Sequence, residues 1–406
     1  MAAPNDYFVD PAINANGGTG VAADPWTRVG GIDVVQNGIN QIVAGPLRDP
    51  VNGDRINVVS DQAPGVTTTT DDTITAVLNL AAYGAPAADA PLIVRGCSRD
   101  PTTGLPVAGN GGIGGMDGAA GGWSTYDGNA GATDYVHFID MHLHNTAAAN
   151  VMRMRDYSSA INCQLDTSTA YALLVNNYCD VLNCYLHSTT NSPLIVATYC
   201  LAFGNYIESP SGAGQSSIFI NGTSSSAERN IIVLDDVGAY GIRFSGHANR
   251  AIGNSILSTV ANTQSGIYYD AVGLSTSVVL NNLIEGFSGA GGAGIDFFNS
   301  TQHVHAYANN SFYDNLEDVA ALTDCDKNYD EDNDLIMAAS PFMKEGAMTF
   351  ANRFNYFKAA IPVRGRAFPT GCQSDRGAMQ VRLAVERTIP ETCIVTIPER
   401  TVLDPL

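Results

Sequence analysis

The chain has 406 residues and a formal net charge of −20, from 40 acidic and 20 basic side chains. Such an acidic surface repels phosphate backbones, which argues against a nucleic-acid partner, and no apolar run reaches the roughly 18 residues that a membrane span needs. Charged residues make up only 15% of the chain and glycine occurs 41 times, a composition that favours short strands and tight turns over salt-bridged helices.

The first residues contain neither the basic head nor the apolar stretch of a signal peptide, so we expect synthesis in the cytoplasm. Five short polar and aromatic motifs then follow in order: Asp6–Asp10, Asn16–Gly20, Ala23–Trp26, Gly53–Val58 and Pro91–Gly96. Residues 97–132 contain three glycine pairs among small residues and predict a long flexible loop before the first full coil. A phosphate-binding loop would need a following helix and a lysine, which this segment does not provide.

A five-residue pattern recurs from about residue 133 to residue 315. An apolar residue precedes Asn or Gly, then Asn or Cys, then any residue, then another apolar one, as in Ile161–Leu165, Leu182–Leu186 and Ile252–Ile256. The third position recurs at 141, 163, 184, 205, 230, 254, 282 and 310, with spacings of 21 to 28 residues. Helical repeats keep a fixed period, whereas coils of β-strands accept insertions in their loops. The repeat therefore predicts an all-β fold, a right-handed parallel β-helix.

The third position of the repeat predicts a structural ladder. Strands of successive coils lie about 4.8 Å apart, so amides at one bend can hydrogen-bond to those above and below. Asn and Gly at the second position also accept a left-handed backbone. The expected members are Cys163, Cys184, Asn205, Asn230, Asn254, Asn282 and Asn310, and we assign them no catalytic role.

Cysteines and tyrosines repeat at the same period. Cys163 and Cys184, like Cys179 and Cys200, are separated by one 21-residue coil, so either pair could form a disulfide if the chain were oxidised. Because no export signal is seen, we expect reduced thiols that fill the core. Tyrosines at 157, 178 and 199 predict a stacked aromatic ladder rather than a ligand platform.

Two groups of residues are candidates for metal binding. An alternating acidic stretch, Asp324, Asp326, Asn328, Asp330 and Asp332, offers the oxygen ligands of a calcium site, although the glycine of a calcium loop is missing. The alternative is a solvated acidic loop. The pairs His142/His144 and His303/His305 each share one strand face, but no third ligand is near in sequence, so surface histidines are the favoured interpretation. We expect no other cofactor.

The end of the repeat contains two closing motifs, Ser340–Phe342 and Ser374–Gln380. Together with the five N-terminal motifs, they resemble the capped start and the closing segment of right-handed parallel β-helix repeat proteins of the pectate-lyase-like superfold, including bacteriophage virion β-helix proteins. The resemblance implies an N-terminal cap and first coils in residues 1–132, regular coils in 133–320, and an acidic loop, closing segment and C-terminal arm in 321–406. It carries over no catalytic residue, and Asp235, Asp236, Asp270 and Asp296 stay unassigned carboxylates.

Three functions fit these observations. The first is a virion structural protein, a bacteriophage capsid decoration or cement protein; the second is a phage tailspike or fibre that binds or cleaves host polysaccharide; the third is an extracellular polysaccharide lyase or hydrolase. The absent leader, the acidity and the missing catalytic signature favour the first, without enzymatic activity. We then expect a homotrimer on the virion surface, made in the host cytoplasm, with other virion proteins as partners, a C-terminal arm (381–406) as anchor and no membrane contact.

Overall fold

The computed structural model describes residues 5–11, 18–27, 34–45, 47, 49, 51–60, 72–73, 78–80, 83–117, 126–128, 133–145, 150–167, 169–208, 212–270, 276–298, 304–308, 310–320, 326–330 and 335–336. The closing motifs and the C-terminal arm predicted from the sequence lie outside these residues. Within the described part of the chain, no helix has the length and apolar character to cross a membrane.

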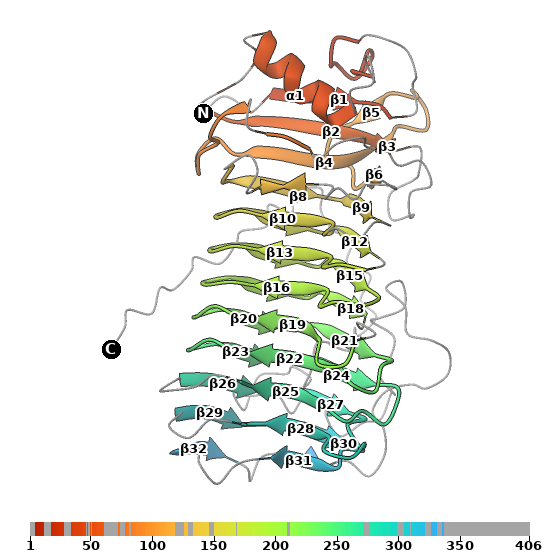
Figure 1. Ribbon diagram of the computed structural model, residues 1–406. Helices are drawn as coiled ribbons and strands as arrows, with labels where there is room; N and C mark the ends of the chain where they lie inside the picture. Colours follow the sequence, from red (N-terminus) through yellow and green to blue (C-terminus); the bar gives the residue numbers. More distant parts are fainter. Residues whose placement is uncertain are drawn as a thin grey trace.

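The described chain is a parallel β-helix, which confirms the predicted solenoid fold (Figure 1). Each regular coil contributes one strand to each of three sheets, numbered here in the order in which a coil visits them. Sheet 1 contains β1 (Asn5–Val9), β2 (Asp54–Ser60), β4 (Leu92–Arg99), β5 (Pro106–Val107), β8 (Val136–Ile139), β11 (Ser159–Ile161), β14 (Asp180–Leu182), β17 (Leu201–Phe203), β20 (Ser226–Glu228), β23 (Arg250–Ile252), β26 (Thr276–Leu280), β29 (Val304–Ala308) and β32 (Asp326–Asp330).

Sheet 2 contains β3 (Asp72–Thr73), β6 (Gly114–Asp117), β9 (Met141–Asn145), β12 (Gln164–Thr167), β15 (Tyr185–Ser188), β18 (Tyr206–Glu208), β21 (Ile231–Leu234), β24 (Ser255–Ser258), β27 (Leu283–Glu285), β30 (Ser311–Tyr313) and β33 (Leu335–Ile336). Sheet 3 contains β7 (Tyr126–Asp127), β10 (Met152–Met154), β13 (Leu173–Val175), β16 (Leu194–Val196), β19 (Ser216–Ile220), β22 (Tyr240–Phe244), β25 (Ser265–Tyr269), β28 (Ala293–Asp296) and β31 (Glu317–Ala320). The apolar residues that begin and end each five-residue repeat lie in strands of sheets 1 and 2, as Ile161 in β11 and Leu165 in β12 do.

Side chains alternate between the core and the outer surface, as the period of two along a strand requires. In β14, Val181 is fully buried while Asp180 and Leu182 are partly exposed. Its parallel neighbours β11 and β17 place Ala160 and Ala202 at the same inward position. The core is therefore a continuous stack of apolar side chains, and every outward residue lies above and below its counterparts in the neighbouring coils.

The bend between sheet 1 and sheet 2 is a single residue with positive φ. Asn162, Asn183 and Gly204 adopt φ values of 53°, 55° and 67° there, as the sequence pattern predicted, and Arg229 adopts 55° without being Asn or Gly. The residue after each of these points inward. The seven ladder positions are fully buried in one column: Cys163, Cys184, Asn205, Asn230, Asn254, Asn282 and Asn310.

The ladder satisfies its buried amides in both directions. The side-chain amide of Asn254 donates to Oδ1 of Asn282 at 3.0 Å and to the backbone carbonyl of Ala227 at 2.9 Å. At the N-terminal end of the asparagine column, the backbone N–H of Cys184 donates to Oδ1 of Asn205 at 2.8 Å. The thiols of Cys163 and Cys184 continue the column as small buried groups. The described cysteines 97, 163, 179, 184 and 200 are free thiols.

A second buried column lies at the bend from sheet 3 back to sheet 1. The backbone N–H of Cys200 donates to Oγ of Ser225 at 2.9 Å, and the N–H of Ser225 donates to Oδ1 of Asn249 at 2.9 Å. The residue just before each member has positive φ, and three of these residues are Tyr157, Tyr178 and Tyr199. Their rings stack with centroid distances of 4.8 and 5.0 Å, as predicted, and Tyr135 extends the stack at 4.9 Å.

The N-terminal end of the solenoid is covered by a helix, α1 (Val34–Ala44), which the low helical tendency of the composition did not predict. Val35, Ile39 and Ile42 recur at helical spacing, and all three are fully buried. They belong to the same apolar cluster as Val9 and Trp26 of the first coil. The helix forms because an apolar face at this position closes the otherwise open end of the core.

The glycine-rich segment 97–132 differs from the long flexible loop predicted for it. Its described part contains β5, β6 and β7 and the end of β4. A Cβ on Gly112 would lie 2.2 Å from the backbone nitrogen of Ser98, and one on Gly114 would lie 2.7 Å from Cβ of Val58. These glycines therefore permit close packing of strands, which composition alone does not distinguish from flexibility.

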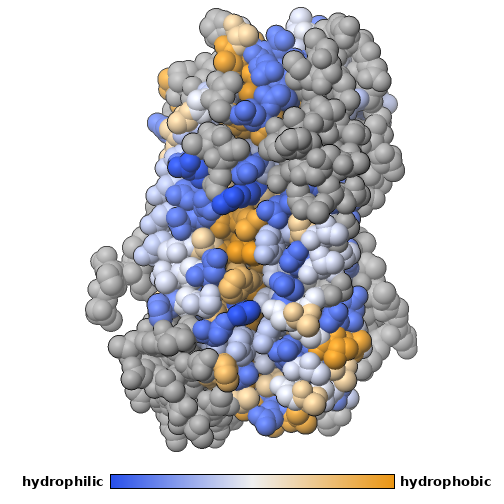
Figure 2. All heavy atoms as spheres, in the orientation of Figure 1, coloured by the Kyte–Doolittle hydropathy of each residue, from blue (hydrophilic) through white to orange (hydrophobic). Residues whose placement is uncertain are grey.

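The outer surface is not uniform. Figure 2 shows a band of apolar side chains along the middle of the visible face, bordered by hydrophilic residues. Sheet 3 places Leu174, Ile195 and Phe219 at successive, partly exposed outward positions. The next outward residue in this register is Arg243, which lies over the ring of Phe219 at 5.2 Å and forms an ion pair with Asp270. The described surface thus separates into apolar and charged stretches along the axis.

Candidate functional site

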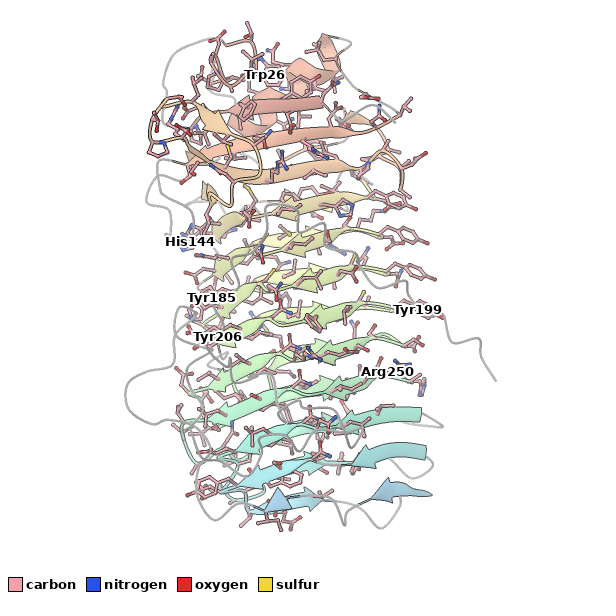
Figure 3. All side chains as sticks on the ribbon, turned by 180° about the vertical axis from the view of Figure 1, so that it is seen from behind. Trp26, His144, Tyr185, Tyr199, Tyr206 and Arg250 are labelled. Carbon is pink, nitrogen blue, oxygen red and sulfur yellow. The ribbon has the colours of Figure 1, made fainter. Side chains whose placement is uncertain are left out.

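The richest group of titratable side chains on the described surface lies on the outward face of sheet 2. Strand register stacks one residue from each of four coils into a first outward column, His144, Asp166, His187 and Glu208. A parallel column two residues earlier contains His142, Gln164, Tyr185 and Tyr206, of which Gln164 and Tyr206 are buried. We call these eight residues the sheet 2 network. Figure 3 shows His144, Tyr185 and Tyr206 along one edge of the solenoid, opposite Tyr199.

His187 and Asp166 form the central pair of the network. Nδ1 of His187 lies 2.6 Å from Oδ1 of Asp166, and Nε2 of His144 lies 4.0 Å from the other carboxylate oxygen. The three side chains are 28%, 38% and 30% exposed for His187, Asp166 and His144, so solvent and a ligand can reach them. The carboxylate holds the imidazole in one orientation and leaves the second ring nitrogen, Nε2, for another partner.

The pair shifts both pKa values. The hydrogen bond that the His187 imidazole donates to Asp166 raises the pKa of His187 above its ordinary value, against the opposing effect of partial burial. Partial burial by itself would raise the pKa of Asp166, but the hydrogen bond and positive charge of His187, with smaller effects of His144 and His142, lower it overall. The structure therefore favours a protonated imidazole beside an ionised carboxylate.

Tyr185 and Glu208 form a second hydrogen-bonded pair one coil away. The phenol of Tyr185 donates to Oε2 of Glu208 at 2.8 Å. Burial and the nearby negative charge of Glu208 raise the pKa of Tyr185, so the phenol keeps its proton at neutral pH. The Tyr185 ring also stacks on Tyr206 at 5.9 Å and on His187 at 6.4 Å, which fixes its orientation.

The geometry offers a proton donor and a proton acceptor on one rigid surface. Asp166 and Glu208 occupy the same column two coils apart, so strand spacing places their backbones about 10 Å from each other, with His187 between them. Because every residue is on a strand, the spacing is set by the scaffold rather than by loops.

The sequence predicts that His142 and His144 share one strand face. The structure confirms this, with nearly parallel rings whose centroids are 6.2 Å apart. Their neighbours Asp166, Tyr185, His187 and Glu208 were not identified from the sequence. The signal existed, because these residues occupy the first and third positions after each ladder residue. Aligning the coils on the ladder and reading those two columns would have found the network.

The other predicted candidates lie elsewhere. Asp326, Asn328 and Asp330 are on strand β32, paired in parallel with β29, whereas Asp324 and Asp332 lie outside the described residues. The calcium site stays a prediction, and within the described chain no cluster of three His, Cys, Asp or Glu side chains is arranged to hold a metal. His305 is on β29, and His303 lies outside the described residues.

The carboxylates left unassigned by the sequence form no pair of their own. Asp270 binds Arg243, and Asp296 lies on β28 with a pKa raised by burial. Both contribute to the pKa of Tyr268, which burial raises to about 12. Asp235 and Asp236 follow β21 in a turn. Asp270 and Asp296 therefore belong to an arginine–aromatic cluster on sheet 3 rather than to an acid–base pair.

Comparison with known proteins finds similarity at low sequence identity to a solved structure. No family model matches the chain, and no curated protein matches it. Among solved structures, the chain is similar to the Dettilon tailspike protein (gp208), with 11% sequence identity and a TM-score of 0.44 over 82% of this chain and 69% of that protein.

Proposed function

We propose that this chain is a β-helix protein of a bacteriophage virion whose sheet 2 network binds and cleaves a host surface polysaccharide. The observation that carries the proposal is the pairing of His187 with Asp166 beside the pairing of Tyr185 with Glu208, on a partly exposed and rigid face of sheet 2. Sequence reasoning favoured a non-enzymatic protein because it found no acid–base pair. The network provides one, and it supports the second of the three functions considered.

The outward face of sheet 2 is better suited to bind an extended polymer than a small molecule. The network runs along the solenoid axis over strands β9, β12, β15 and β18, which strand spacing extends to about 14 Å. Imidazole, phenol and carboxylate groups hydrogen-bond to sugar hydroxyls, and the partly exposed ring of Tyr185 gives apolar contact to sugar C–H groups. A polysaccharide lying along the axis would contact several coils at once.

Hydrolysis follows from the protonation states of the network. His187, held protonated by Asp166, donates a proton to the glycosidic oxygen as its bond to the anomeric carbon breaks. Glu208 accepts a proton from a water molecule whose oxygen bonds to that carbon, so one water is added across the bond. Asp166 acts as a positioning residue for His187. Tyr185 stabilises the carboxylate of Glu208 through its hydrogen bond.

The experiment is incubation of the intact chain with a panel of bacterial capsular and lipopolysaccharide glycans, followed by measurement of binding and of new reducing ends. We expect one glycan class to be bound and shortened. His187→Gln should retain binding and lose cleavage, whereas His137→Gln, on sheet 1, should retain both. Failure of the intact chain to bind any glycan of the bacterium infected by the source particle would overturn the proposal.

Capsid decoration, the function favoured by the sequence, needs no catalytic group and is the second candidate. A rigid, acidic rod supports it, because like charge limits aggregation of decorated particles. Electron microscopy of the source particle separates the two candidates. Density for the solenoid on the capsid shell supports decoration, and density at the tail supports polysaccharide recognition. Deleting residues 381–406 then tests the predicted anchor in the same preparation.

A further inference from the structure

A regular, largely apolar surface lies on sheet 1, away from the sheet 2 network. It is formed by three successive coils whose equivalent residues lie 21 positions apart in the sequence, each contributing the tyrosine at the bend and the two outward residues of the following strand. We call it the tyrosine face. Its nine members are Tyr157, Ser159 and Ile161, then Tyr178, Asp180 and Leu182, then Tyr199, Leu201 and Phe203.

The tyrosines form an exposed ridge along one edge of this face. Tyr157, Tyr178 and Tyr199 are 41%, 37% and 43% exposed, which is unusual for large aromatic side chains in a repeated array. Figure 3 shows Tyr199 pointing outward at the edge of the solenoid. The other edge of the face is an aliphatic and aromatic column, Ile161, Leu182 and Phe203, with each residue partly exposed.

The face is flat because its coils contain no insertion at either bend. The bend that borders the aliphatic column is one residue in each coil, Asn162, Asn183 or Gly204. The tyrosine rings remain parallel within 11° from one coil to the next. A second flat surface can therefore approach all three coils without obstruction by a loop of these bends.

Charge points to the kind of partner. The whole chain has a net charge of −20, yet Asp180 is the one charged residue among the nine members of the face. Two copies that meet through most other surfaces bring many carboxylates together, which costs free energy through like-charge repulsion. Contact through the tyrosine face brings few together and removes exposed aromatic surface from water.

The spacing of the tyrosine rings also indicates which kind of partner fits the face. Its ridge repeats every 4.8 to 5.0 Å, the distance between coils, and this repeat is a property of the solenoid. A partner can contact the tyrosine of every coil when its own surface has the same repeat. We propose that the tyrosine face binds a second copy of this chain, with the two solenoids side by side. This association is independent of the function proposed for sheet 2, and it gives the predicted homotrimer a defined surface.

Light scattering coupled to size-exclusion chromatography tests the proposal on the full chain. We expect a mass that is a multiple of the 42.7 kDa chain, and a return to the mass of one chain in Leu182→Glu and in Ile161→Glu. Ile195→Glu is the matched control, since Ile195 is a partly exposed aliphatic residue of the same coil as Leu182 but lies on sheet 3. It should leave the multiple unchanged. Circular dichroism checks that each variant keeps its strand content.

Photocrosslinking identifies directly which molecule binds the tyrosine face. Benzoylphenylalanine in place of Tyr178 should give a covalent product between two chains, with the cross-link mapped to sheet 1 of the second copy. A single-chain mass for the unmodified protein up to high micromolar concentration overturns the proposal. So does a cross-link from position 178 to residues 337–406 of the same chain, or, on particles, to a capsid protein alone. Retained glycan cleavage in Leu182→Glu would show that assembly and the sheet 2 function are separate.

Discussion

Asn205 and Asn230 hydrogen-bond across adjacent coils, with the side-chain amide of Asn205 donating to Oδ1 of Asn230 at 2.9 Å. Asn230 in turn donates to Asn254 at 3.0 Å and to the carbonyl of Ala202 at 3.0 Å. Each amide is both a donor to the next coil and an acceptor from the previous one. The scaffold that positions both proposed surfaces therefore depends on a column of groups that have no access to water.

We predict that Asn230→Leu destabilises the protein by about 1–3 kcal/mol, because Asn205 and Asn254 both lose a partner inside the core. Urea unfolding followed by circular dichroism measures the free energy change. Asn221→Leu is the control, since Asn221 is exposed outside the ladder and should change the unfolding free energy little. Equal effects of the two substitutions would show that the ladder adds no specific stability.

The His187–Asp166 pair predicts a titration above the ordinary histidine value of about 6.5. Asp166→Asn removes the hydrogen-bonded carboxylate, so the pKa of His187 should fall. Nuclear magnetic resonance of the imidazole protons as a function of pH measures both. His137 is an internal control, because burial lowers its pKa to about 4 and the substitution is on another sheet. An unchanged His187 titration in Asp166→Asn would contradict the pairing.

The same pair gives stability a defined pH dependence. A raised pKa for His187 stabilises the fold fully below about 6.5, and this contribution is lost as pH rises through the folded pKa. The lowered pKa of Asp166 stabilises above about 3.9 and is lost as pH falls through its folded value. Both contributions coexist between those limits. Unfolding free energies of the protein and of Asp166→Asn should therefore differ most at about pH 4 to 6.5.

If the sheet 2 network cleaves a glycan, Glu208→Gln should lower turnover about 100-fold or more, because the proton acceptor is lost. Tyr185→Phe removes only the hydrogen bond to Glu208 and should have a smaller effect on turnover. Initial rates of reducing-end release measure both, and a pH profile should show activity decreasing as His187 loses its proton. Equal turnover in Glu208→Gln and the unmodified protein would remove Glu208 from the reaction.

The tyrosine stack predicts opposite effects of glycine at two equivalent bends. Tyr178 and Ser224 have φ values of 57° and 56°, so glycine relieves the same backbone strain at each. Ser224→Gly should therefore be neutral or stabilising by up to about 1 kcal/mol. Tyr178→Gly also loses two ring contacts, each of about 0.5–1.5 kcal/mol, together with side-chain packing, so it should destabilise. Thermal unfolding of both variants measures the contrast.

Strand positions and the left-handed bends were predictable because they depend on local rules. Residues such as Asn162 and Asn183 mark a bend wherever they occur in the repeat, and their apolar neighbours alternate with a period of two. Helix α1 was not predicted because its apolar face is stabilised only by packing over the open end of the first coil, which the sequence pattern does not show. The strands within residues 97–132 were missed because Gly112 and Gly114 have the composition of a flexible loop.

The solenoid, its buried asparagine column and its tyrosine stack follow from the amino-acid sequence, because each repeats at intervals that one chain displays directly. Which outward residues meet depends on the tertiary structure, since Asp166, His187 and Glu208 come from separate coils and none of them stands out from other polar residues in its own segment. Stacking at the strand spacing turns such separated residues into neighbours. The fold could therefore be read along the chain, whereas both proposed surfaces run across the coils.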